Sequence, residues 1–247
     1  MTDADTKPVD LYLLGIGIRG FQQVTQETVE ILRRCRKVLH LSNAHLELSE
    51  VNPNTENLDS IYWTAEDWYR VARRMVKYVL DEVGRGPGVA LVSYGSPTLF
   101  DDIGSKLQLR LRRAKKRCVV LPAVSCLETL SIDLGIDYGE GLQVLEATTL
   151  VQSEVSLSPQ LHTLLLQIYE FGTSTTPDAI ENCPGRFEPL INYLEHFYPR
   201  NHRVVLAFSD DGYRGGPLLI RGHLSTLDAK SSLMIPGMTL YLPPYLP

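Results

Sequence analysis

The sequence predicts an α/β fold with two lobes, an N-terminal parallel sheet and a C-terminal mixed sheet. In the first half, short apolar runs alternate with amphipathic segments, as expected where helices connect parallel strands. After Gly135 the apolar runs continue, but one amphipathic helix and one polar glycine loop separate them instead. We therefore expect a first lobe over residues 1–121 and a second lobe over residues 122–247.

Hydrophobic periodicity and turn residues set the elements of the first lobe. Thr25 is expected to cap a helix, and the segment 58–62 is expected to be irregular. The predicted strands cover 10–15, 37–41, 89–93 and 117–122, and the predicted helices cover 25–34, 65–83, 101–115 and 126–134.

The second lobe is predicted from short runs of strand character. Its amphipathic helix covers 189–197, and the loop 210–217 has the polar, glycine-rich composition of a hairpin connection. The predicted strands cover 142–146, 161–169, 203–209, 218–223 and 238–243.

Three strands of the first lobe end in loops marked by glycine or proline. The most distinctive is Tyr94-Gly95-Ser96-Pro97, and the others contain Gly15-Ile16-Gly17 and Ser125. Ligands of open α/β sheets bind outside the carboxyl ends of the strands, so these loops are predicted to bind one. An ordinary strand-to-helix connection is the alternative for Tyr94-Gly95-Ser96-Pro97. A dinucleotide site is disfavoured because the third glycine of that fingerprint is missing.

Composition excludes several classes of protein. The chain has 247 residues, 44% hydrophobic and 21% charged, with a net charge of −5, so it has no overall attraction for nucleic acid. No apolar run reaches the length of a membrane span. The four cysteines lack the spacing of a metal site or disulfide framework, which predicts reduced thiols, no metal and a cytoplasmic location: Cys35, Cys118, Cys126 and Cys183.

Six motifs are spread over nearly the whole chain: LYLLGIGIRGFQQVTQETVEILRRCRKVLHLS, VALVSYGSPTLFDD, LPAVSCLETLSIDLGID, TLLLQI, VVLAF and MTLYLPP. Together they resemble the tetrapyrrole methylase superfamily, the class III S-adenosylmethionine-dependent methyltransferases. Within the superfamily, YGSPTLF looks closest to the borosin peptide-backbone N-methyltransferases. The resemblance implies two αβα lobes that clamp S-adenosylmethionine in the cleft between them, and homodimers are typical of the fold.

The resemblance also implies residue roles. Loops of the first lobe would hold the methionine and sulfonium end of the cofactor, and residues of the second lobe would contact its adenosine. The implied cofactor-binding residues are Gly15, Gly17, Tyr94, Gly95, Ser96, Pro97, Leu99, Phe100, Ser125, Cys126, Gln167, Ala207, Thr239 and Leu240.

An amide nitrogen is a poor nucleophile, so methylating it requires a base and a group that stabilises the imidate oxygen. The sequence places aromatic residues and arginines just before the Tyr94 strand. A tyrosine ionises more readily beside a fixed cation. We therefore expect Tyr94 and an arginine of the long helix, Arg73, to be catalytic, with Tyr69 and Tyr62 as further candidates.

The sequence leaves more than one identity possible for the methyl acceptor. The first loop reads GIGIRG where corrin and porphyrin methylases have Gly-Pro-Gly-Asp-Pro, which favours a peptide acceptor over a tetrapyrrole. The arginine-tyrosine pair of borosin enzymes does not align either, because Trp68 or Tyr69 and Ala72 stand there. The alternatives are a methyltransferase of a tetrapyrrole, corrinoid or other small metabolite, and a non-catalytic module that binds S-adenosylmethionine.

Overall fold

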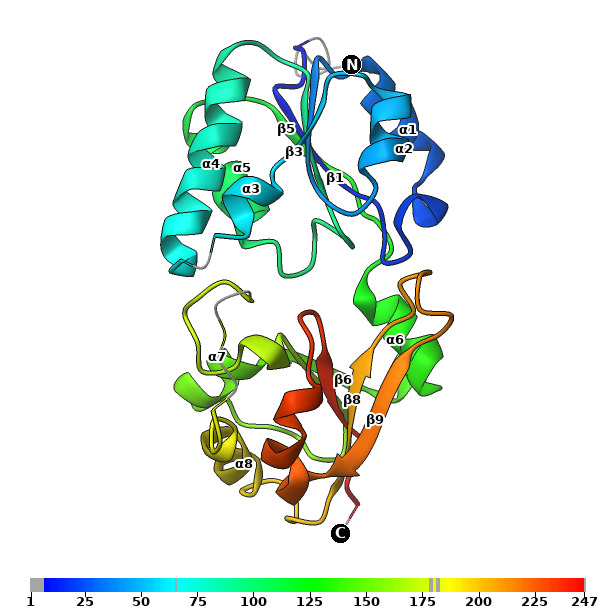
Figure 1. Ribbon diagram of the computed structural model, residues 1–247, viewed down its shortest axis with the longest axis vertical. Coiled ribbons are helices and arrows are strands. Elements are labelled where there is room, and N and C mark those ends of the chain that lie inside the picture. The colour runs from blue at the N-terminus through cyan, green and yellow to red at the C-terminus, as the bar shows by residue number, and fades with distance from the viewer. Residues whose placement is uncertain (1–6, 65, 178–179, 181–182, 247) are drawn as a thin grey trace. The chain divides into compact units, whose positions relative to one another are not determined.

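The chain divides into two compact units. A computed structural model describes residues 7–64, 66–177, 180 and 183–246. The units are Met1–Thr129 and Leu130–Pro247 (Figure 1), so the helix α6 (Cys126–Leu134) begins in the first and ends in the second. The boundary predicted from sequence, between residues 121 and 122, lies eight residues earlier than this division.

The first unit is built on a parallel sheet, as predicted, and the sheet has five strands where the sequence predicted four. The strand order is β3-β2-β4-β1-β5, with β1 between β4 and β5. Because all pairings in this sheet are parallel, the carboxyl ends of the strands lie along one edge, where ligands of such sheets bind. The strands are β1 (Leu11–Gly15), β2 (Lys37–Leu41), β3 (Thr55–Asn57), β4 (Val89–Ser93) and β5 (Cys118–Val120).

Helices cover both faces of this sheet, which confirms an αβα arrangement (Figure 1). Leu13 and Leu91 face a core formed with α4 and α5, whereas Leu14 and Val92 face a second core formed with α1 and α2. No helix in the described ranges combines the length and hydrophobicity needed to cross a membrane. The helices are α1 (Gln26–Arg34), α2 (His45–Val51), α3 (Asp59–Tyr62), α4 (Trp68–Gly84) and α5 (Asp102–Arg113).

The local structure agrees with the sequence-based prediction at Thr25 and differs from it at residues 58–62. The Thr25 side chain accepts a hydrogen bond from the Thr28 backbone N–H at 3.2 Å, which confirms the predicted N-cap of α1. The segment predicted to be irregular contains α3 instead. This four-residue helix follows the three-residue strand β3, whose residues are polar and carry no strand signal.

The second unit contains the predicted mixed sheet, in the order β6-β7-β10-β8-β9. The strands β6 and β7 are parallel, and the remaining pairs are antiparallel. Its core lies against α7 (Ala147–Gln152) and α8 (Glu188–Leu194). The strands are β6 (Leu142–Glu146), β7 (His162–Leu166), β8 (Arg203–Phe208), β9 (Leu218–His223) and β10 (Thr239–Leu242).

Two buried histidines make the stability of the fold depend on pH. His40 lies at the end of β2, where burial and the neighbouring His45 lower its pKa below 6.5, and burial likewise lowers the pKa of His202. The His40 Nε2 and the His45 Nδ1 are 2.9 Å apart. Because these imidazoles bind protons more readily in the unfolded chain, their contribution to stability is complete above pH 6.5 and is lost as the pH falls through the folded-state pKa.

We therefore expect the free energy of unfolding to decrease as the pH is lowered from about 7 to about 5, in urea titrations at each pH. The variant His40→Gln should flatten this dependence. His196→Gln is the matched control, because His196 is exposed and bonds the Tyr193 carbonyl. Equal pH dependence in wild type and His40→Gln would contradict the assignment.

Candidate functional site

Three loops of the first unit meet at Gly15. This residue ends β1, and a Cβ placed on it would lie 2.2 Å from the Gly95 carbonyl oxygen. The same Cβ would lie 2.8 Å from the Ala123 Cβ and 2.9 Å from the Pro97 Cδ. Contacts this short are sterically forbidden, so glycine at position 15 is what allows the loops after β1, β4 and β5 to pack together.

The first two loops are joined by a pair of backbone hydrogen bonds. The Gly17 N–H donates to the Gly95 carbonyl at 3.1 Å, and the Gly95 N–H donates to the Gly17 carbonyl at 3.0 Å. Both residues have positive φ, +78° and +73°, which glycine adopts without strain. The predicted binding glycines therefore form one closed structure at the carboxyl edge of the sheet.

Gln23 fixes the first loop from beneath. Its Oε1 accepts hydrogen bonds from the backbone N–H groups of Ile18 and Arg19, at 2.7 and 2.9 Å. Sequence reasoning did not select this residue, because a single glutamine eight residues after the strand matches no binding motif. Its role depends on the turn at Gly17, which brings the side chain back to the loop.

Ser96 connects the second and third loops. Its side chain is buried, its Oγ lies 2.8 Å from the Thr98 Oγ1, and it accepts a hydrogen bond from the Ala123 N–H at 3.3 Å. The Ser96 hydroxyl thus holds protein groups together. Beyond it, Pro97 is buried, Leu99 is half-buried, and Phe100 is 45% exposed with a φ of +53°.

Ser125 begins α6 in the manner of a capping box. Its Oγ accepts from the Leu127 N–H at 3.1 Å, while its own N–H and hydroxyl donate to the Glu128 carboxylate, each at 2.7 Å. The Ser125 N–H is therefore satisfied by Glu128. Burial raises the pKa of the neighbouring Cys126 thiol to about 11, which keeps this thiol protonated and unreactive at neutral pH.

Tyr94 is the first residue of the second loop and follows β4 directly. Its backbone N–H donates to the Leu41 carbonyl at 3.0 Å, which ties the end of β4 to the end of β2. Its side chain is 42% exposed. A phenol presented from a fixed backbone position at the ligand edge is suited to contact a substrate.

The other predicted catalytic residues lie on or before α4. The Arg73 guanidinium lies over the ring of Tyr69, 5.8 Å from its centroid, and Tyr69 is 63% exposed. Tyr62 packs edge-on against Trp63 and Trp68, with centroids 4.9 and 5.5 Å away. The structure thus pairs Arg73 with Tyr69 and places Tyr62 in an aromatic cluster.

The predicted residues of the second unit gather on adjoining strands. Ala207 on β8 is the registered partner of Thr239 on β10, and both are buried. Leu240 points to the opposite face, into the core of the unit. Gln167 follows β7 in the left-handed conformation, with φ +55°, a strained state for a residue other than glycine.

Comparison with known proteins adds a family match over most of the chain. Residues 10–213 match the model of the tetrapyrrole (corrin/porphyrin) methylases. This range includes the three loops around Gly15, the helices α4 and α5, and most of the second unit as far as the loop after β8.

The relatives found by sequence include fungal proteins described as methyltransferase/ribosomally synthesized type I borosin cyclic peptide precursors. The one from Mycena rosella is 25% identical over 203 residues, which cover 80% of this chain and 50% of the relative. The one from Coprinopsis marcescibilis is 26% identical over 251 residues, 99% of this chain and 64% of the relative. The chain spans about half the length of the first of these curated relatives.

Solved structures share the fold. The uroporphyrin-III-C-methyltransferase of Thermus thermophilus aligns with a TM-score of 0.64 and 19% identity, over 94% of this chain and 91% of that chain. The precorrin-6Y methylase of Archaeoglobus fulgidus aligns with a TM-score of 0.59 and 18% identity, over 96% of this chain and all of that chain.

Proposed function

The chain belongs to the tetrapyrrole methylase family, which makes it a methyltransferase, and from this premise we propose that it N-methylates the backbone of a peptide with S-adenosylmethionine as methyl donor. The assignment of a peptide as methyl acceptor rests on the similarity to borosin precursors over 80% or more of the chain. Since the chain spans only part of those relatives, their complete activity is not transferred to it.

The loops around Gly15 fit the methionine end of the donor. A Cβ placed on Gly95 would meet Ile18 Cδ1 at 3.5 Å and otherwise lie in open space, so the missing side chain leaves room beside the backbone. The Gly95 backbone is held by its reciprocal hydrogen bonds with Gly17, and the adjoining Ser96 hydroxyl accepts a hydrogen bond from the Ala123 N–H. We propose that Gly15, Gly17 and the residues 94–100 bind the donor mainly through backbone groups, with Ser125 and Cys126 at the third loop.

The second unit offers a set suited to the adenosine. Ala207 is small, and the Thr239 hydroxyl lies on the same face of the sheet beside it. The strained backbone of Gln167 presents polar groups at the end of β7. We propose that these residues, with the backbone of Leu240, contact the adenosine.

S-adenosylmethionine, when bound, supplies a methyl group on a sulfonium. The sulfur that loses this methyl group departs as a neutral thioether. The protein must then hold the acceptor nitrogen in line and remove its proton. We propose that Tyr94 acts as a phenolate, whose oxygen would accept the amide proton and become a phenol while the new N–C bond forms and the S–CH3 bond of the donor breaks. Arg73 would stabilise the imidate oxygen, with Tyr69 keeping its guanidinium oriented and Tyr62 lining the acceptor site.

Mass spectrometry with the purified protein tests the function. A synthetic peptide rich in small and apolar residues is incubated with the donor, and a tetrapyrrole precursor is incubated in parallel. We expect mass gains of whole methyl groups on the peptide, located to backbone nitrogens by fragmentation. Methylation of the tetrapyrrole alone would overturn the peptide assignment, and donor binding without methylation of either compound would favour the non-catalytic module.

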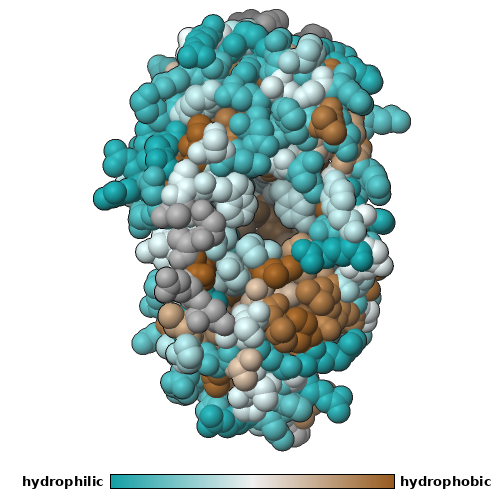
Figure 2. Space-filling model, viewed as in Figure 1, coloured by the Kyte–Doolittle hydropathy of each residue, from teal (hydrophilic) through white to brown (hydrophobic). Residues whose placement is uncertain are grey.

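We also propose a homodimer that acts in the cytoplasm. The edge strand β9 carries half-buried Leu218, Leu219 and Ile220, and Figure 2 shows apolar side chains gathered over β8 and β9. An apolar edge strand is commonly covered by a partner. The four free cysteines are consistent with a reducing compartment. Light scattering on the purified protein measures the number of subunits.

A further inference from the structure

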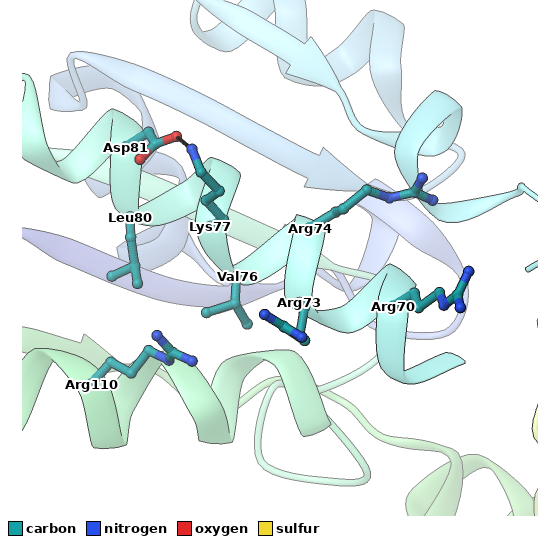
Figure 3. A pocket seen from close by; sticks show the side chains of 8 residues that line it. All are labelled: Arg70, Arg73, Arg74, Val76, Lys77, Leu80, Asp81 and Arg110. Carbon is teal, nitrogen blue, oxygen red and sulfur yellow. Dashed lines mark hydrogen bonds and ion pairs between the residues drawn. The ribbon is translucent and has the colours of Figure 1, made fainter. Parts of the chain in front are cut away.

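A basic groove runs between α4 and α5, outside the loops around Gly15. Two adjoining hollows of about 510 and 770 Å³ share Arg73, Val76, Leu80 and Arg110. Figure 3 shows Val76 and Leu80 turned toward α5, with the Arg73 and Arg110 guanidinium groups beside them. The groove as a whole also includes Tyr69, Arg74, Lys77, Lys106, Leu109 and Arg113.

The charges of the basic groove are of two kinds. Four of its lysines and arginines form ion pairs with carboxylates: Arg74 with Glu66, Lys77 with Asp81, Lys106 with Asp102 and Lys116 with Asp10. Across the described ranges, by contrast, no ion pair joins Arg73, Arg110 or Arg113 to a carboxylate. These guanidinium groups concentrate positive charge on a protein whose net charge is −5.

The floor of the basic groove is apolar. Leu109 is 48% exposed, Leu80 is half-buried, and Val76 is buried. The surrounding surface over α4 is mostly hydrophilic (Figure 2). An apolar strip bordered by arginines matches a ligand with leucine-like side chains on one face and carboxylates along its edges.

We propose that the basic groove binds an acidic, amphipathic peptide segment of a partner protein. The basic groove also contains Tyr69 and Arg73, which we propose for the acceptor site, so the test uses Arg110 and Arg113, which have no proposed part in methyl transfer. Nucleic acid fits less well, because the floor consists of aliphatic side chains and Tyr69 is the one aromatic ring that the described residues bring to the lining. Single strands bind instead through stacked aromatic residues. A second copy of this surface also fits poorly, since a twofold interface would bring the same arginines face to face.

The test uses a fluorescein-labelled peptide in which glutamate and leucine recur at helical spacing, with fluorescence anisotropy as the measurement. We expect the peptide to bind the whole protein. Its affinity should fall by about tenfold or more when the salt concentration is raised from about 50 mM to about 500 mM. The double variant Arg110→Glu/Arg113→Glu should weaken binding by about thirtyfold, and donor binding should stay unchanged. Absence of binding at low salt would overturn the proposal.

A matched control is available on the opposite face of the sheet. Arg33 and Arg34 lie in the last turn of α1, as Arg110 and Arg113 lie in the last turn of α5, so Arg33→Glu/Arg34→Glu makes the same charge change at the same helix position. It should alter peptide binding by less than about twofold. Equal weakening by both double variants would show a general charge effect and overturn the proposal.

Two further arms complete the experiment. A single-stranded DNA oligonucleotide of equal charge should bind more weakly than the peptide, and tighter binding that is sensitive to Arg110 would overturn the peptide in favour of nucleic acid. Should the charge-reversed variant fail to fold by circular dichroism, Arg110→Gln/Arg113→Gln replaces it, with an expected weakening of about tenfold.

Discussion

Replacing Gly15 with alanine is expected to abolish donor binding and to lower the free energy of unfolding of the first unit by about 3 kcal/mol. The added Cβ would lie 2.2 Å from the Gly95 carbonyl oxygen, which is backbone and has no rotamer with which to move away. Relief requires the loops after β1 and β4 to separate. Urea unfolding measures the stability, and calorimetry with S-adenosylmethionine measures the binding.

Gly84→Ala is the matched control. Gly84 ends α4 in the same unit, and nothing lies within 4 Å of a Cβ placed on it. Alanine favours the helix, so this variant should be neutral or more stable by up to about 1 kcal/mol. If Gly15→Ala kept full stability and full donor affinity, the loops would not be packed through Gly15 as described.

The variant Tyr94→Phe is expected to reduce methyl transfer by at least about 10²-fold while donor affinity changes little. Phenylalanine retains the ring and lacks the oxygen proposed to accept the amide proton. Arg73→Ala should likewise reduce turnover more than donor binding, because it would leave the developing charge on the acceptor oxygen uncompensated. Single-turnover rates and calorimetry separate the two quantities.

Tyr12→Phe controls for the loss of a tyrosine hydroxyl in the same unit. Tyr12 is half-buried near the amino end of β1, paired with Ala90 and packed against the core beneath α1 and α2, whereas the loops follow the carboxyl ends of the strands. Its replacement should leave the rate within about twofold. Unchanged turnover in both Tyr94→Phe and Arg73→Ala would contradict their catalytic assignment, and a parallel loss of donor affinity would assign Tyr94 to the cofactor site alone.

The long and strongly patterned elements could be predicted from the sequence because their burial determines their composition. The strands at 37–41, 142–146 and 218–223 agree with the structure residue by residue. The short elements could not, since β3 reads Thr-Glu-Asn and forms only as the edge strand beside β2. Such a strand is specified by its neighbour, which a local pattern does not contain.

The part of the candidate site that lies at the carboxyl ends of the parallel strands could be predicted, because the direction of the strands alone places these loops together. Glycines and prolines at strand ends mark the ligand edge of a parallel sheet, and the structure brings Gly15, Gly95 and Ala123 together there. The role of Gln23 depends on the turn at Gly17, and the contact of Arg73 with Tyr69 depends on helix geometry. Residue types alone therefore do not reveal either of them. The catalytic pairing of Tyr94 with Arg73 stays a prediction.

The reciprocal hydrogen bonds between Gly17 and Gly95 couple two segments that are 78 positions apart in the chain. Neither loop can open without breaking both bonds, so the two amides should exchange with solvent in a single cooperative event. For protein engineering this means that the loops form one exchangeable part. Transplanting either of them alone from another member of the family would leave its counterpart without a partner.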